Sequence, residues 1–521
     1  MTAVEAGRAR VETARSEAIE EASSDGGVVF GPSNRLDCEA IERIAHGARV
    51  AYSVEARRVM ERSCAVLAEA VASGEEIYGL TTGFGPHVCY AADPDASRQG
   101  SALIAHLAAG WGPLASRDVV RATIAARCQV LAQGCSAISP QAADAMLAIL
   151  NSDVVPAVPA IGSVGASGDL IPLAHVARVL GGEGLVLNGA GEAIPAAAAL
   201  ERAGLAPVEL EARDALSIVN GTALMTGQAA LSLARAERLL GVAERLTAWA
   251  YAQLAARRQA LDPRLHAARG HAGQVESAER IGQAIPVAYV EDEGRPLQDV
   301  YSVRCAPQIL GACRDQLEYA RRVIEREING VSDNPVVWSE PGSEAVLHGG
   351  NFQGQQIAFA SDAVNLAITQ IANLIERQLD VVLNPELNGG APLLLAWTPG
   401  AMSGLAGAQI TATAMVADMR RSAVPSSVAS LPTNGRNQDV VSMGTMASRV
   451  ACEQADRLSG VLAIHAIALR QLAFLRECGR ADGPVVQPPA WCPPIDGLKV
   501  DRALHGDIER VAADFIRPTD L

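Results

Sequence analysis

Residues 165–169, Gly-Ala-Ser-Gly-Asp, contain three small residues that could react with one another. In a tight turn, the amide nitrogen of Gly168 can attack the carbonyl carbon of Ala166. Loss of two waters, one of them from the Ser167 side chain, leaves a five-membered ring with an exocyclic methylene, 4-methylideneimidazole-5-one (MIO). Glycine suits the ring-closing nitrogen because it lets backbone approach backbone. Such a ring is an electrophile that the twenty side chains lack, although an Ala-Ser-Gly tripeptide taken alone is more often an ordinary turn.

A tyrosine in a glycine-rich segment could supply a base. Residues 77–85 read Ile-Tyr-Gly-Leu-Thr-Thr-Gly-Phe-Gly, so glycines at 79, 83 and 85 follow Tyr78. A free tyrosine has a pKa of about 10, which must be lowered or coupled to another group for the tyrosine to act near neutral pH. The glycines predict a mobile loop that would act as a lid. Without its context, Tyr78 would be interpreted as a half-buried core residue.

Several further motifs follow in order along the chain. They are Gly-Ser-Val-Gly-Ala-Ser-Gly-Asp-Leu-Ile-Pro-Leu-Ala-His at 162–175, Val-Asn-Gly-Thr at 219–222, Asp-Val-Tyr-Ser-Val-Arg-Cys-Ala-Pro-Gln at 299–308, Asp-Asn-Pro at 333–335, His-Gly-Gly-Asn-Phe-Gln-Gly at 348–354 and Leu-Pro-Thr-Asn-Gly-Arg-Asn-Gln-Asp-Val-Val-Ser-Met-Gly at 431–444. With these blocks the chain resembles the MIO-dependent aromatic amino acid lyases and aminomutases, which include histidine, phenylalanine and tyrosine ammonia lyases. The resemblance extends over about residues 30–480, in the family's order.

The resemblance implies a role for each matching residue. The tripeptide would form MIO, which turns the substrate amine into a leaving group, and Tyr78 would remove the β-proton. Arg304 would bind the substrate carboxylate, for which a bidentate guanidinium is suited, with help from Asn334. The other matches are Asn220, Tyr301 and Gln308 at the MIO or its developing oxyanion, Phe352 packed beside the MIO, and Gly85, Asn437 and Gln438 on the substrate side. Taken singly, such residues more often form surface ion pairs, cap helices or pack in the core.

Two positions bear on the substrate. The pair His106-Leu107 resembles tyrosine ammonia lyases, in which the imidazole hydrogen-bonds the phenol, whereas phenylalanine-selective members tend to have Phe there and histidine lyases a Ser-His pair. A buried hydrogen-bonding group can discriminate strongly against a substrate that lacks its partner. Asp418 stands where the family usually has Glu, which serves the substrate in histidine lyases. This departure argues against a histidine lyase and leaves the role of Asp418 open.

Composition indicates an all-α protein. The chain has 521 residues, of which 49% are hydrophobic but only 3% aromatic, so Ala, Leu, Val and Ile must build its core. Ala and Leu are strong helix formers. A net charge of −15 argues against nucleic-acid binding, which needs a basic surface. Ten cysteines without a Cys-x-x-Cys pair, and an N-terminus without an apolar signal core, predict reduced thiols in a cytoplasmic protein.

The chain divides into three predicted regions. Residues 1–27 form a polar N-terminal tail, 28–215 a smaller mixed region whose loops carry the tripeptide, and 216–521 a long helical bundle with C-terminal helices. Long helices must bury their apolar faces against one another, and the resemblance implies a homotetramer with sites built from several subunits. The segment at 461–475 is interrupted by His465 and Arg470 and reads as too short and too polar for a membrane span. The helical stretches are expected at 214–256, 402–421 and 449–476.

The sequence lacks the motifs typical of metal-dependent and nucleotide-dependent enzymes. The chain has no His-Glu-x-x-His, and the segment 83–85 lacks the third glycine of a dinucleotide fingerprint, so neither a metal nor a nucleotide cofactor is expected. The prediction is a lyase that converts L-tyrosine to trans-p-coumarate and ammonia. A 2,3-aminomutase with the same residues, a phenylalanine or histidine ammonia lyase, and a non-catalytic helical scaffold remain as alternatives.

Overall fold

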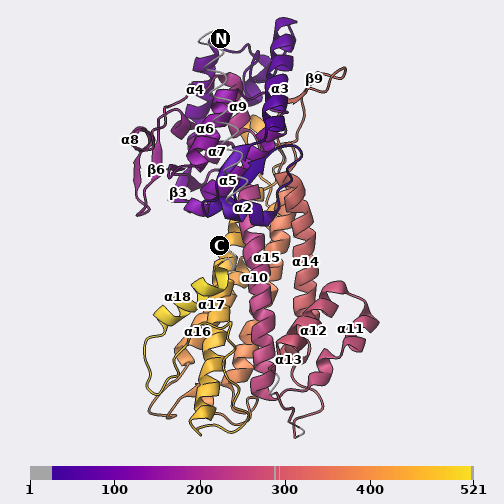
Figure 1. Ribbon diagram of the computed structural model, residues 1–521, viewed down its shortest axis with the longest axis vertical. Helices are drawn as coiled ribbons and strands as arrows, with labels where there is room; N and C mark the ends of the chain where they lie inside the picture. The colour runs from indigo at the N-terminus through magenta and orange to yellow at the C-terminus, as the bar shows by residue number, and fades with distance from the viewer. Residues whose placement is uncertain (1–25, 287–288, 293, 518–521) are drawn as a thin grey trace. The chain divides into compact units, whose positions relative to one another are not determined.

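The computed structural model describes residues 26–286, 289–292 and 294–517 (Figure 1). The predicted tail at 1–27 therefore lies almost entirely outside the described residues. The described chain forms two packed units: unit 1 holds 26–231, 321–361 and 425–449, and unit 2 holds the remainder. Each unit is built from three separate segments of the sequence, whereas the sequence predicted one boundary at residue 215. That domain boundary stays a prediction.

Unit 1 combines short helices with small sheets, as expected for the mixed region. Its sheets are the parallel pair β1–β2, the antiparallel pairs β3–β5 and β8–β9, and the three-stranded β4–β6–β7. The strands are β1 (Val28–Phe30), β2 (Val50–Tyr52), β3 (Trp111–Leu114), β4 (Val155–Pro156), β5 (Pro159–Ile161), β6 (Leu185–Leu187), β7 (Ala193–Pro195), β8 (Val336–Trp338) and β9 (Ala345–Leu347). The helices contained in unit 1 are α2 (Cys38–Ala45), α3 (Val54–Ala72), α4 (Ala96–Leu107), α5 (Arg117–Ala132), α6 (Pro140–Leu150), α7 (Leu170–Leu180), α8 (Ala196–Arg202) and α9 (Ala212–Val219), with the 3₁₀ turns η1 (Gly85–Cys89), η4 (Ser426–Val428) and η5 (Asn434–Arg436).

Side-chain caps explain where several of these helices begin. Ser53 accepts a hydrogen bond from the backbone of the first turn of α3, and Ser139 does the same for α6, which has Pro140 at its first position. Asp95 caps α4 by accepting from the amides of Ser97 and Arg98. The cap fixes the start of α4, the helix whose last turn carries His106.

Four long helices, α10 (Ala223–Leu254), α14 (Ala306–Ile328), α15 (Gln355–Leu383) and α17 (Gly444–Glu477), contribute residues to both units (Figure 1). The other elements of unit 2 are η2 (Arg258–Leu261), α11 (Pro263–Arg269), α12 (Ala272–Ala284), α13 (Tyr301–Arg304), η3 (Leu393–Leu395), α16 (Ala406–Arg421) and α18 (His505–Ile516). The predicted all-α class with a long-helix bundle is confirmed. The helix expected at 214–256 is two helices, because Asn220 adopts an extended backbone (φ −92°, ψ 101°) between α9 and α10.

Two core helices, α15 and α17, are long and apolar enough to cross a membrane by length and composition. The expectation that 461–475 is too short for such a span is wrong, because this stretch belongs to the 34-residue α17. Burial gives the better reason against a span: 78% of the apolar window of α15 and 89% of that of α17 are buried inside the protein. Both helices use their apolar surface to build the core.

Candidate active site

A cavity of about 960 Å³ in unit 1 brings together most of the predicted site residues. Its walls come from the loop after α3, from α4, from the tripeptide loop, from the break between α9 and α10, and from loops near residues 334, 352 and 434. The predicted residues among its lining are Tyr78, Gly85, His106, Leu107, Ala166, Ser167, Gly168, Asn220, Asn334, Phe352, Asn437 and Gln438.

The tripeptide lies in a bent segment that only small residues can form. Both Gly165 and Gly168 have a φ of +69°, a backbone conformation that L side chains rarely adopt. A Cβ on Gly168 would also overlap the carbonyl oxygen of Gly221. The amide of Asp169 donates to that same carbonyl over 2.7 Å. The backbone of the tripeptide is therefore pressed against the α9–α10 break.

Hydrogen bonds on both sides of the tripeptide hold this bend. The carbonyl oxygen of Gly165 accepts from Ser442 Oγ at 2.8 Å. The buried carboxyl of Asp169 accepts from the Met225 amide at 2.9 Å and from the hydroxyls of Ser163 and Thr445. Burial raises the pKa of Asp169, and these donors oppose the rise. The segment is thus anchored at both ends before any covalent change.

The Ser167 hydroxyl, which cyclisation would remove, faces the side-chain amide of Gln438. Gln438 Nε2 donates to Ser167 Oγ over 2.8 Å, and the Oε1 of Gln438 accepts from Thr433 Oγ1 at 2.7 Å. The amide of Gln438 is therefore oriented by a residue of its own loop. It delivers its N–H donors to the centre of the tripeptide.

Tyr78 points its phenol into the loop that carries it. Its hydroxyl oxygen accepts from the Gly85 amide at 2.7 Å, and the Phe84 ring packs against it edge-on with centroids 6.3 Å apart. Burial raises the pKa of Tyr78, and the Gly85 amide opposes the rise. Within this chain the phenol is therefore neutral at ordinary pH, so a base role requires a positive charge from elsewhere.

Two asparagines meet at the back of the cavity. Asn220 Nδ2 donates to the carbonyl oxygen of Asn334 over 2.8 Å, while the buried Asn220 Oδ1 has no partner among the described residues. The side-chain oxygen of Asn334 accepts from the Gly349 amide at 2.8 Å. Asn220 is thereby held through its amide nitrogen and Asn334 through its amide oxygen.

A buried charge cluster that sequence reasoning missed supports these asparagines. The carboxylate of Asp333 lies 3.2 Å from both Arg127 and Arg213, and all three side chains are buried. Arg127 donates to the carbonyl of Ser217, three residues before Asn220. Arg213 donates to the carbonyl of Pro335, directly after Asn334. A sequence signal existed for one member only, because Asp333 directly precedes Asn334.

His106 has a defined tautomer. Its Nδ1 lies 3.0 Å from the carbonyl oxygen of Ala102, one turn earlier in α4. A carbonyl can only accept, so Nδ1 carries a proton, and in the neutral imidazole Nε2 is then the acceptor. Sequence reasoning also missed His87, which lines the same cavity and whose ring lies 6.0 Å from that of Tyr90. Its place two residues after Gly85 was the available signal.

Four predicted site residues lie in unit 2 and do not line the cavity: Tyr301, Arg304, Gln308 and Asp418. The Arg304 guanidinium stacks over the Tyr301 ring at 4.5 Å, and 69% of Tyr301 is exposed. Arg304 Nε and Gln308 Oε1 have no hydrogen-bond partner within the described ranges. Asp418 is exposed on α16 and lies 3.6 Å from Arg421. Arg304 and Gln308 thus each keep a polar atom whose hydrogen bond is unmet among the described residues.

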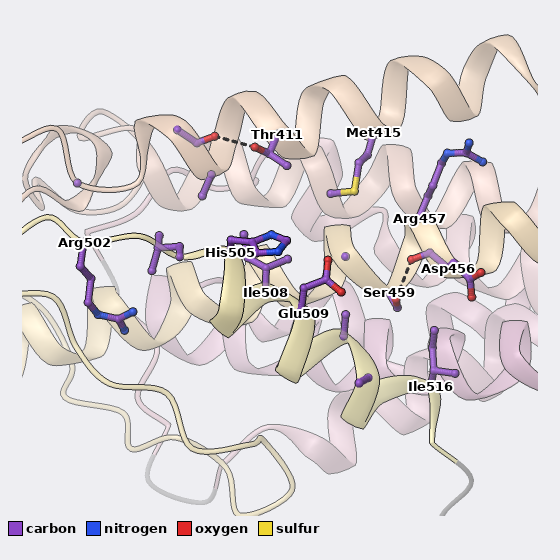
Figure 2. Close-up of a pocket in the computed structure, with 17 residues that line it drawn as sticks. Thr411, Met415, Asp456, Arg457, Ser459, Arg502, His505, Ile508, Glu509 and Ile516 are labelled. Atoms are coloured by element: carbon purple, nitrogen blue, oxygen red, sulfur yellow. Dashed lines mark hydrogen bonds between the residues drawn. The ribbon is translucent and has the colours of Figure 1, made fainter. Parts of the chain in front are cut away.

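A second cavity, of about 790 Å³, lies in unit 2 between α16, α17 and α18. Figure 2 shows His505, Ile508 and Glu509 of α18 opposite Met415 of α16. None of the predicted site residues lines it. The described part of the chain also holds no group of three or more His, Cys, Asp or Glu residues that could bind a metal.

Comparison with known proteins decides the family. Residues 36–487 match the aromatic amino acid lyase family. The chain belongs to this family. It is similar to a tyrosine ammonia-lyase from Cereibacter sphaeroides, with 42% identity over 511 residues that cover 93% of this chain and 97% of that one. It is also similar to a histidine ammonia-lyase from Treponema denticola, with 37% identity over 478 residues that cover 91% and 93% of the two chains.

The fold is that of this lyase family. A solved tyrosine aminomutase from Streptomyces globisporus matches with a TM-score of 0.85 and 35% identity, covering 94% of this chain and 96% of that one. The protein is therefore an ammonia-lyase enzyme that deaminates an aromatic amino acid, and the scaffold alternative is wrong. Relatives named for tyrosine and for histidine are similarly close, so family membership leaves the substrate to be argued from the site.

Proposed function

We propose that the enzyme converts L-tyrosine to trans-p-coumarate and ammonia. The observation that carries this proposal is the acceptor Nε2 of His106 in the wall of the cavity that holds the tripeptide. A tyrosine phenol can donate its O–H to this nitrogen, whereas a phenylalanine ring cannot. Because His106 is exposed in the single chain, the proposal requires that bound substrate and neighbouring copies exclude water from the imidazole. Sites built to bind a hydroxyl reject an analogue that lacks it far more strongly than an apolar pocket rejects an added methylene.

We propose further that Ala166, Ser167 and Gly168 form MIO. The two left-handed glycine conformations, the contact of Gly168 with Gly221 and the anchored flanks all suit a backbone cyclisation. The formed group would supply the electrophile that makes the amine a leaving group. Gln438 and Asn220, which lie around the tripeptide, would donate hydrogen bonds as negative charge develops.

Tyr78 is the proposed base, and it needs a cation nearby because burial raises its pKa. Arg304, with an unmet N–H, is the proposed source of that charge and the proposed anchor of the substrate carboxylate. We therefore propose that Tyr301, Arg304, Gln308 and Asp418 reach the cavity of another copy in a homotetramer.

We propose a cytoplasmic location, because none of the ten cysteines, all within the described residues, forms a disulfide. A 2,3-aminomutase is the second candidate, favoured by the likeness to the solved tyrosine aminomutase. A mutase would use the same residues but re-add the ammonia at the β-carbon before the acrylate leaves. The shorter Asp418 and the His106-Leu107 pair argue against a histidine lyase.

One set of assays tests these proposals. Purified enzyme is incubated separately with tyrosine, phenylalanine and histidine, and the products are followed by ultraviolet absorbance and NMR. We expect p-coumarate as the main product, with cinnamate formed more slowly. Dominant urocanate would overturn the tyrosine proposal, and accumulating β-tyrosine would favour the mutase. Intact-mass measurement should show a chain lighter than the encoded one by two waters, and light scattering should show a tetramer.

A further inference from the structure

The backbone of Tyr78 is held by a histidine that the proposed reaction does not use. The Tyr78 amide donates to His348 Nε2 over 3.1 Å, across 270 residues of sequence. A histidine nitrogen accepts only while it carries no proton, so the His348 proton belongs on Nδ1. His348 itself is exposed and does not line the cavity. It contacts the proposed base without reaching the substrate space.

The β8–β9 hairpin places His348 at this point. Val336 pairs with Leu347 in the hairpin, so the residues just outside this pair, Asn334-Pro335 and His348-Gly349, are brought side by side. The Gly349 amide donates to the side-chain oxygen of Asn334 over 2.8 Å. Adjacent residues at the end of β9 thus bind the two predicted site residues Tyr78 and Asn334.

Apolar packing brings the tyrosine segment to the same hairpin. Ile77, directly before Tyr78, is fully buried in a cluster with Leu67 of α3 and Val337 of β8, and Val346 of β9 packs against this cluster. Non-directional packing sets the position of Ile77, and its carbonyl oxygen accepts from the amides of Leu80 and Thr81 at 3.1 and 2.9 Å. The hydrogen bond to His348 holds the N–H on the other side of this same peptide.

The other contacts of the loop complete the restraint. The Tyr78 hydroxyl accepts from Gly85, and Gln99 Nε2 donates to the carbonyl oxygens of Gly79 and Thr82 at 3.1 and 3.3 Å. These bonds restrain the phenol and the peptides after Tyr78. At the Tyr78 amide itself, the hydrogen bond is to His348.

We propose that His348 is a positioning residue for Tyr78. Its Nε2 holds the Tyr78 peptide in register with Asn334, so that the phenol oxygen reaches the β-carbon side of the substrate in one orientation. This inference rests on the proposed function for its effect on catalysis, because it takes Tyr78 as the base. The structural part, a hydrogen bond that orders the Tyr78 peptide, stands on the geometry alone.

Three variants separate positioning from general damage. His348→Ala removes the acceptor, and His348→Gln offers an amide oxygen near the place of Nε2. His46→Ala is the matched control, because His46 is also an exposed histidine of unit 1, at the end of α2, away from the cavity. Each variant is compared with the parent enzyme for tyrosine turnover and for hydrogen–deuterium exchange in peptides spanning residues 77–85.

We expect His348→Ala to lower kcat by about 3- to 10-fold, the loss of one ordinary hydrogen bond, with KM changed by less than about 2-fold. Exchange at the Tyr78 amide should become faster. His348→Gln should restore most of both properties, and His46→Ala should change neither. In a Tyr78→Phe background, His348→Ala should cost no further activity, because the two residues act as one unit.

Unchanged exchange at residues 77–85 in His348→Ala would overturn the proposal, as would equal losses in the Ala and Gln variants. A separate outcome concerns the proposed function. If Tyr78→Phe kept full activity, Tyr78 would not be the base, while the exchange data would still decide whether His348 orders its peptide.

Discussion

Replacing Gly168 with alanine tests the cyclisation most directly. An alanine at a φ of +69° costs about 1–2 kcal/mol in backbone strain. The added Cβ would also overlap the Gly221 carbonyl, which already binds the Asp169 amide. Gly204 is a matched control, because it has the same φ of +69° with no atom within 4 Å of an added Cβ. Gly204→Ala therefore carries the strain without the collision.

The assay is intact mass of each purified variant, followed by tyrosine turnover and denaturant unfolding. Gly168→Ala should keep the full encoded mass and show no turnover above background, because the bend cannot close. Gly204→Ala should lose two waters like the parent, stay active, and be less stable by about 1–2 kcal/mol. A Gly168→Ala protein that loses two waters would refute the reasoning, since the contact with Gly221 would then not control the turn.

Three further predictions follow from single contacts. His106→Phe removes the acceptor for a phenol, so the ratio of kcat/KM for tyrosine over phenylalanine should fall by about 10-fold, the effect of one hydrogen bond, measured from p-coumarate and cinnamate formation. Asp333→Asn removes the carboxylate that pairs with the buried Arg127 and Arg213 and should cost about 3–5 kcal/mol in denaturant unfolding. Asp153→Asn, which breaks the exposed pair with Arg117, should cost about 0–1 kcal/mol. Burial lowers the pKa of His465 to about 3, so below about pH 6.5 the unfolded chain takes up a proton that the folded chain refuses, and stability falls as the pH drops. At pH 5 this loss is about 2 kcal/mol, and His465→Leu should lack it.

Each of these has an outcome that would contradict it. An unchanged substrate ratio in His106→Phe would remove the imidazole from substrate selection. Equal destabilisation by Asp333→Asn and Asp153→Asn would mean that burial of the cluster does not matter. The same stability loss between pH 8 and pH 5 in His465→Leu and in the parent would assign the acid sensitivity to other groups.

Most of the site residues that local sequence motifs predicted line the cavity. The tyrosine loop, the tripeptide and the loops near residues 334, 352 and 437 each hold residues that line one cavity in unit 1. Their roles remain proposals. The same kind of motif predicted three residues that lie in unit 2 instead: Tyr301, Arg304 and Gln308. A motif identifies a residue type in a local sequence, but it does not show which packed unit will contain that residue.

The supporting contacts were beyond prediction from the sequence. Arg127 lies in an Ala-rich helix and Asp333 in a loop 206 residues later, and nothing local in either segment marks the other as its partner. His348 and Tyr78 are separated by 270 residues. Such pairs form only when long-range packing brings the segments together. The prediction of a single helix at 214–256 was wrong for a reason that the sequence already contained. The Asn-Gly pair at 220–221 ends α9.

The sequence by itself determined the helical class. Through the ordered motifs around it, the sequence also distinguished Ala166-Ser167-Gly168, which we propose forms MIO, from the second Ala-Ser-Gly tripeptide at 72–74. Both results depend on properties that residues carry with them: Ala and Leu favour helices, and glycine lets backbone approach backbone. Only the tertiary structure decided the state of the polar groups. The raised pKa of Tyr78 comes from burial, and the acceptor Nε2 of His348 is fixed by the amide of Tyr78, 270 residues away in sequence. Charge and tautomer respond to the surroundings of a side chain, and those surroundings exist only after folding.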